Sequence, residues 1–221
     1  MPNQTFFNLS DEKQEAIVKA ALNEFSEFDY SSASISRIVR NTGIAKGSFY
    51  QYFHDKKDLY LYLLSLVSEA KKTFVSQTAS PDAKMDFYEY LSWLFDASIE
   101  FDRTHPVLSR LAYRAFYGNS SVRDLEQEKA FTNFIRQLVI TGIESGDINI
   151  NIDLEMAVFT IDTLLDAFNS KYIPALTATT ADTLAEQGNY SFDIEAARKA
   201  FNKLIQILKF GLSEQENSQQ N

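Results

Sequence analysis

The sequence predicts an all-α protein, with a small helix-turn-helix domain at its amino-terminal end joined to a larger helical domain. Apolar residues recur at three- and four-residue spacing along most of the chain, which is typical of amphipathic helices. Only seven glycines and four prolines interrupt the 221 residues. In addition, Ser or Asp stands directly before most of the apolar stretches, where these residues favour helix starts.

The first helix is expected over about residues 11–28, with Ser10 as its cap. After the turn DYSSA, Ser34 can cap a short helix over about 35–42. Gly43 then occupies the position where a glycine ends a helix in the left-handed conformation.

A second short helix is expected over about 46–53, with Phe49 and Phe53 on one buried face. Two short helices joined by a four-residue turn that contains glycine form a helix-turn-helix motif. Asp55 can cap the long helix that follows, over about 56–79.

The net charge of −9 is divided unevenly along the chain. From Ser34 to Lys57 there are five basic residues and one acid, a charge of +4, so the rest carries −13 (−9 minus +4). A basic patch on an acidic body is typical of a protein that binds a polyanion at one site. The alternative is a solvated charged face without a ligand.

Three lysines, Lys46, Lys56 and Lys57, fall in the first turns of predicted helices, where positive charge opposes the helix dipole by about 0.3–1 kcal/mol each. Folding alone gives no evident reason for them, whereas a bound phosphate would. Gly47 would let the backbone come close to such a ligand, although a glycine near a helix start can also be merely tolerated.

The stretch SISRIVRNTGIAKGSFYQYFHDKKDLY, residues 34–60, resembles the DNA-binding region of the TetR family of bacterial transcriptional repressors. The family motif runs Gly–hydrophobic–x–x–Gly–(Ser/Thr)–aromatic–Tyr–x–Tyr–Phe–x–x–Lys. The resemblance implies a three-helix DNA-binding domain, here residues 1–58, and a helical ligand-binding and dimerisation domain, here 59–213. Ala45 departs from the Ser or Thr that the family commonly places before the second helix. We expect 214–221 to be a disordered tail.

By this resemblance, Ser34, Ser36 and Arg37 brace the motif on the DNA backbone, and Tyr50, Tyr52 and Lys56 contact phosphates. Gln51 could pair with adenine in the major groove. For the two tyrosines the alternative is ordinary half-buried packing. The full set of expected DNA-binding residues is Ser34, Ser36, Arg37, Lys46, Gly47, Ser48, Tyr50, Gln51, Tyr52 and Lys56.

Aromatic residues are dense between residues 85 and 134, and a helix over about 82–102 is apolar on more than one face, so we expect it to lie centrally. Arg110 and Arg114 could hold an anionic end of a mostly apolar ligand, or instead pair with surface acids. The candidate ligand-binding residues are Trp93, Arg110, Tyr113, Arg114, Phe116, Tyr117 and Phe134.

Asp153 and Asp193 can cap two late helices, each with more apolar surface than one neighbour can cover. Such helices suit a four-helix interface between two subunits. The candidate interface residues are Leu154, Val158, Ile161, Leu165, Phe168, Phe201, Leu204, Ile205 and Leu208. Residues 174–192 give no interpretable pattern.

No sequence feature favours an enzyme. The two histidines, His54 and His105, lie far apart, and neither a phosphate-binding loop nor a convergent pair of acids is present, so we expect no cofactor or metal. The absence of cysteine fits a reducing compartment, and neither a signal peptide nor a run of about 20 apolar residues is present. We therefore expect a cytoplasmic protein.

The sequence thus predicts a dimeric repressor of a palindromic DNA operator, released by a small, largely apolar effector. The alternative is a helical ligand-binding or scaffolding dimer without sequence-specific DNA binding. In the first case, the helix over 56–79 would act as a lever between the two domains. The sequence does not identify the operator, its spacing, the regulated genes or the effector. It also does not distinguish a repressor from an activator.

Overall fold

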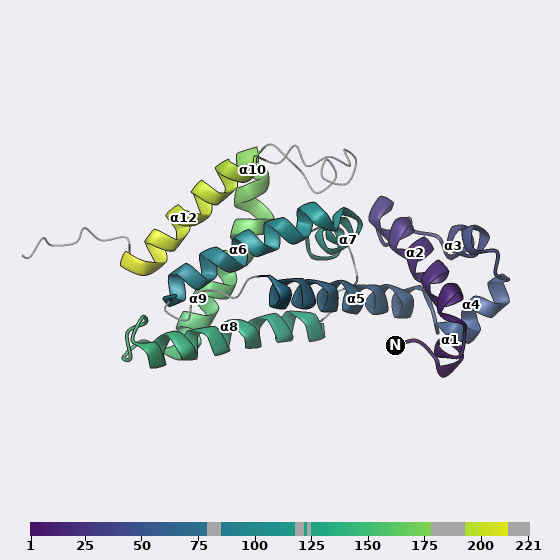
Figure 1. The fold of residues 1–221 in the computed structure, drawn as a ribbon, viewed down its shortest axis with the longest axis horizontal. Coiled ribbons are helices and arrows are strands. Elements are labelled where there is room, and N and C mark those ends of the chain that lie inside the picture. Colours follow the sequence, from purple (N-terminus) through teal and green to yellow (C-terminus); the bar gives the residue numbers. More distant parts are fainter. Residues whose placement is uncertain (79–84, 118–121, 123–124, 178–192, 212–221) are drawn as a thin grey trace, which may run out of the picture.

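The computed structural model describes residues 1–78, 85–117, 122, 125–177 and 193–211, and every regular element among them is helical. The predicted fold class is therefore confirmed. Figure 1 shows an elongated molecule with short helices gathered at one end and longer helices at the other. We call α1 to α4 the head and α6 to α12 the body. Helix α5 joins them.

The head contains α1 (Gln4–Phe7), α2 (Asp11–Glu27), α3 (Ile35–Thr42) and α4 (Lys46–Tyr52). The last three confirm the prediction, whereas α1 was not predicted. Ser34 caps α3 as expected, because its hydroxyl accepts the Arg37 N–H. Ser10 occupies the cap position of α2 but makes no side-chain cap hydrogen bond, so that expectation was wrong.

Helix α5 (Lys56–Gln77) runs from the head into the body (Figure 1). Its 22 residues correspond to about 33 Å. Asp55 caps it by accepting the Asp58 N–H at 2.8 Å, and this hydrogen bond lowers the pKa of the Asp55 carboxyl. The predicted cap is therefore confirmed.

The body is a bundle in which α6 lies centrally, in contact with α5, α7, α8 and α12, as predicted. Asp153 and Asp193 cap their helices as expected, whereas the capping box of Asp86 and Glu89 at the start of α6 was not predicted. The π-helical turn η1, continuous with α9, was not predicted either. The elements are α6 (Phe87–Thr104), α7 (Pro106–Tyr117), α8 (Leu125–Ser145), α9 (Leu154–Ala167), η1 (Phe168–Tyr172), α10 (Ile173–Thr177) and α12 (Ile194–Phe210).

Two apolar clusters form the core. The first joins head and body, because Leu111 of α7 and Leu63 of α5 belong to the same cluster as Phe25 and Phe49 of the head. The predicted domain boundary after residue 58 falls in the first turn of α5 and is crossed by this cluster. The head is therefore packed directly on the body and is not connected to it by α5 alone.

The second cluster lies within the body and contains the side chains predicted for the subunit interface, of which Leu154, Leu204 and Leu208 are only partly buried. The predicted stripe packs inside one protomer, because α6 and α8 cover it. Val158, Ile161 and Phe201, for example, are at most 6% exposed. The stripe comprises Leu154, Val158, Ile161, Leu165, Phe168, Phe201, Leu204, Ile205 and Leu208.

Residues 178–192, most of the segment without an interpretable pattern, and the tail 214–221, expected to be disordered, lie outside the described residues. Among the residues that are described, no helix is long and apolar enough to cross a bilayer.

Candidate nucleic-acid interface

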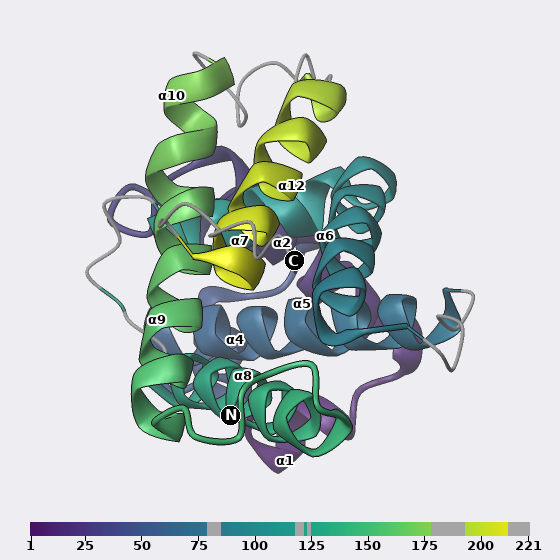
Figure 2. The ribbon, with the colours of Figure 1, turned by 90° about the vertical axis from the view of Figure 1, so that its left-hand side faces the viewer.

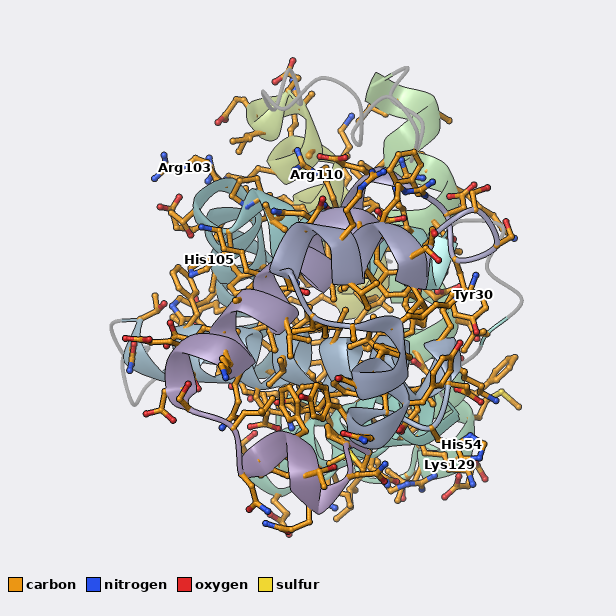
Figure 3. All side chains as sticks on the ribbon, turned by 90° about the vertical axis from the view of Figure 1, so that its right-hand side faces the viewer. Tyr30, His54, Arg103, His105, Arg110 and Lys129 are labelled. Carbon is orange, nitrogen blue, oxygen red and sulfur yellow. The ribbon has the colours of Figure 1, made fainter. Side chains whose placement is uncertain are left out.

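The helix-turn-helix motif forms as the sequence predicts. Gly43 ends α3 with φ of 71°, a left-handed conformation that a residue with a Cβ adopts only at a cost. Phe49 and Phe53 are fully buried and hold α4 against the core, which confirms their predicted role. Helices α3 and α4 lie at the end of the molecule that faces the viewer in Figure 3.

The outer face of α4 is polar and accessible. Lys46, Gly47, Tyr50 and Gln51 are exposed. Within the described part of the chain, neither the Lys46 ammonium nor the Gln51 amide makes a hydrogen bond or ion pair. These side chains are free to meet a ligand at the end of the molecule.

Three further predicted residues flank this face. Ser36 is exposed at the start of α3, whereas Ser48 and Tyr52 on α4 are half-buried. The ring of Tyr52 lies edge-on to Phe6, with 6.4 Å between the ring centroids. Tyr52 therefore packs within the head with part of its surface, which was the alternative reading of its role.

A buried carboxylate determines the position of α3. Glu24 of α2 is only 5% exposed, and it accepts the Ser34 N–H at 2.7 Å. The Arg37 guanidinium donates to both Glu24 oxygens, at 2.8 and 3.0 Å from Nε. The hydrogen bonds to Glu24 raise the pKa of Arg37.

Arg37 therefore has a structural role in the head, with 36% of its side chain exposed. Besides Glu24, it donates from Nη2 to the Ser32 carbonyl at 2.8 Å, and its guanidinium lies 4.2 Å from the centre of the Phe28 ring. These contacts give Arg37 a structural role, and its expected contact with the DNA backbone stays a prediction. Ser34 has a similar structural role, since its hydroxyl caps α3 and its N–H binds Glu24.

Lys56 also has an intramolecular role, which corrects the expectation that folding gives no reason for this lysine. Its ammonium donates to the carbonyls of Tyr30, Ser31 and Ala33 at 2.7, 3.2 and 3.0 Å. It also lies 4.6 Å from the centre of the Tyr30 ring. All three N–H donors of the ammonium are used, so none is left for the phosphate contact expected of Lys56. We therefore leave Lys56 out of the phosphate contacts proposed below.

The candidate ligand residues are not gathered at one place by the observed contacts. Arg114 turns to the head, donating to the Ser26 carbonyl at 3.1 Å and to Asp29 at 2.6 Å. The alternative of an ion pair with an acid is therefore correct for this residue. The buried Nε of Arg110, labelled in Figure 3, has no hydrogen-bond partner in the part of the chain that the structure describes.

Of the other candidate ligand residues, Trp93 on α6 packs against Tyr90, with ring centroids 5.5 Å apart, and Phe134 on α8 is 41% exposed. Tyr113 on α7 is half-buried. The side chains of Phe116 and Tyr117 lie outside the described residues.

Sequence reasoning missed Glu24, and one signal could have identified it. Glu24 lies seven residues after Ile17 and three after Ala21, on the apolar face of α2. A carboxylate in such a stripe is buried at a high cost unless it is paired. The position of Glu24 in the apolar stripe therefore indicates that a cationic side chain pairs with it. In the structure this side chain is Arg37.

The comparisons with known proteins agree with this geometry. The family described as "Bacterial regulatory proteins, tetR family" matches residues 17–63, and "Tetracyclin repressor-like, C-terminal domain" matches 85–213. A crystal structure of a TetR family transcriptional regulator from Chloroflexus aurantiacus is 36% identical, with a TM-score of 0.69, over 97% of this chain and 100% of that one.

Two proteins of Bacillus subtilis are also similar. The fatty acid metabolism regulator protein is 26% identical over 152 residues, which cover 64% of this chain and 73% of the relative. The structure of the transcriptional regulator FadR in complex with stearoyl-CoA has a TM-score of 0.60 at 20% identity, over 90% of this chain and 98% of that one.

Lys56 and Lys46 form a matched pair for testing a structural role of Lys56 and a phosphate-binding role of Lys46. Lys56→Met should lower the free energy of unfolding by about 2 kcal/mol, because three carbonyls lose a charged donor. It should leave the slope of log affinity against log salt for a random DNA duplex unchanged. Lys46→Met should leave stability unchanged and reduce that slope by about 0.9. Chemical denaturation and salt-dependent fluorescence anisotropy measure the two quantities, and the opposite pattern would contradict both assignments.

Proposed function

The chain belongs to the TetR family of bacterial transcriptional regulators, and from this premise we propose that it is a repressor that reads a palindromic operator as a dimer. The observation that carries the proposal is the polar, unpartnered outer face of α4 on a firmly held helix-turn-helix. We propose a regulatory and not a catalytic role, since the relatives named above are regulators.

Within this proposal, α4 enters the major groove of DNA. Gln51 reads a base edge, and Lys46 and Tyr50 contact phosphates, with Gly47 allowing the backbone to come close. Ser36, Ser48 and the exposed part of Tyr52 lie beside this face. The charge of +4 over residues 34–57 favours association with DNA, whereas the acidic remainder of the chain disfavours contact elsewhere.

We place the subunit interface on the outer faces of the late helices, opposite the stripe that forms the protomer core. Figure 2 shows α9, α10 and α12 together at the end of the body that faces the viewer. Large apolar side chains are exposed on these elements, including Phe159 at 64% and Met156 at 60%. Among the described residues of α9, η1, α10 and α12, these side chains are Met156, Phe159, Tyr172, Leu176, Ile207 and Phe210.

Covering this face with a second copy removes apolar surface from water. To read successive major grooves, the two-fold dimer must set its two α4 helices about 34–36 Å apart.

The effector is proposed to be a small, largely apolar molecule that binds in the body. It can change DNA affinity only by binding one arrangement of the two heads better than another. Among the described residues, body and head are connected by α5 and by the contact of α7 with α2, where Arg114 binds Ser26 and Asp29. Because a structural relative was crystallised with stearoyl-CoA, long-chain acyl compounds are the first class to test.

Gln51→Ala should relax the preference at one base pair of each half-site, at a cost of about 1–3 kcal/mol for the preferred base. Selection from a randomised DNA library with the wild-type protein and the variant would show this as a loss of information at that position. If the wild-type protein and the variant select the same motif, Gln51 does not contribute to base recognition. A wild-type protein that selects no motif would instead favour a helical dimer without sequence-specific DNA binding.

Phe159→Glu should convert the dimer into a monomer, because each interface would bury two unpaired carboxylates. Sedimentation velocity at micromolar concentration measures the change. Phe7→Glu, which alters a 45% exposed phenylalanine of the head, is the control and should leave the dimer intact. A Phe159→Glu variant that still sediments as a dimer would place the interface elsewhere.

Stearoyl-CoA should bind more weakly to the operator complex than to the free protein, by the same factor by which it weakens DNA binding. A tenfold effect corresponds to about 1.4 kcal/mol of coupling. Calorimetric titrations with and without a selected duplex measure it, with free coenzyme A as the control. Equal affinities in the two titrations would exclude stearoyl-CoA as the effector.

A further inference from the structure

The short segment before α2 crosses the carboxyl-terminal end of α4. The Asn3 N–H donates to the Tyr52 carbonyl at 2.8 Å, and the Asn3 side-chain amide donates to the Gln51 carbonyl at 3.2 Å. The Thr5 hydroxyl donates to the same Gln51 carbonyl. Two consecutive carbonyls at the end of α4 are therefore held by residues 46 to 49 positions earlier in the chain.

These contacts supply what a short helix lacks. The carbonyls at the end of a helix have no intrahelical partner. In the seven-residue α4 the Phe49 carbonyl still accepts the Phe53 N–H, so the carbonyls of Tyr50, Gln51 and Tyr52 are the ones in this position. A helix of this length is not stable by itself. Its direction is therefore determined by the groups that bind its ends and its apolar face.

Phe6 anchors the segment. It is fully buried, and its ring centroid lies 5.0 Å from that of Phe53 and 5.7 Å from that of Tyr62 on α5. Asn3 and Thr5, on either side of the α1 start, are exposed. The buried ring thus fixes the segment between α4 and α5, and its polar neighbours reach the α4 carbonyls.

We propose that residues 3–6 form a splint that holds α4 at the angle needed to read DNA. Asn3, Thr5 and Phe6 are then positioning residues for sequence recognition, acting through the α4 backbone. Gln51 links the two roles, since its side chain is the proposed base reader and its carbonyl accepts both side-chain hydrogen bonds of the splint. The inference rests on the proposed function, in which α4 enters the major groove.

The test compares the double variant Asn3→Ala/Thr5→Val with the wild type in the full-length chain. The two DNA probes are a duplex selected by the wild-type protein from a randomised library and the randomised pool itself. Loss of the two side-chain hydrogen bonds should weaken binding to the selected duplex by about tenfold. Binding to the pool and its salt slope should not change, because the phosphate contacts remain. Gln4→Ala is the matched control, since its side chain bonds only Asn8 within the same segment.

Amide hydrogen exchange supplies a readout that does not depend on DNA. The double variant should exchange the α4 amides faster than the wild type and leave those of α3 and α12 unchanged. A wild-type protein that binds both probes equally would refute base reading by α4, and with it the role of the splint in recognition. The splint proposal would be overturned if the double variant kept both the wild-type preference for the selected duplex and the wild-type exchange rates of the α4 amides. An equal loss of affinity for both probes would also overturn it.

Discussion

The turn between α2 and α3, residues 28–34, is held by three cations from three different helices. Arg37 of α3 binds the Ser32 carbonyl, Lys56 of α5 binds three further carbonyls, and Arg114 of α7 binds the Asp29 carboxylate. A turn exposes carbonyls that no helix or sheet satisfies, so charged donors stabilise it strongly. The start of α3 is fixed in this way, and through the Gly43 turn so is the position of α4.

This arrangement means that the body contributes to the geometry of the head. Arg114 is only 11% exposed and lies on a helix whose Leu111 is buried in the core shared with the head. A displacement of α7 would therefore act directly on the turn that positions α3. The long helix expected over 56–79 forms as α5 and, among the described residues, connects head and body together with the α7 contact. The α7 contact connects the body to the same turn, through Arg114 and Asp29.

Local rules were sufficient for most of the fold and for the exposed residues of the candidate site. Periodicity and caps such as Asp55, Asp153 and Gly43 act within a few residues, so the sequence shows them directly. Lys56 was misread because its partners lie 23 to 26 positions earlier, in a turn with no pattern of its own. Helix α1 was missed because four residues are too few for a period. The apolar stripe of α9 was correctly found, but a stripe does not tell whether the same chain or a second subunit covers it.

The most direct test of a head positioned by the body is amide hydrogen exchange in the variant Arg114→Gln, without DNA or effector. Amides of residues 29–42 should exchange about tenfold faster than in the wild type, while those of α9 and α12 stay unchanged. Arg103→Gln is the control, because Arg103 is 57% exposed and pairs with Glu100 on its own helix. Equal exchange of residues 29–42 in the two variants would show that Arg114 does not hold the turn, and would contradict the account.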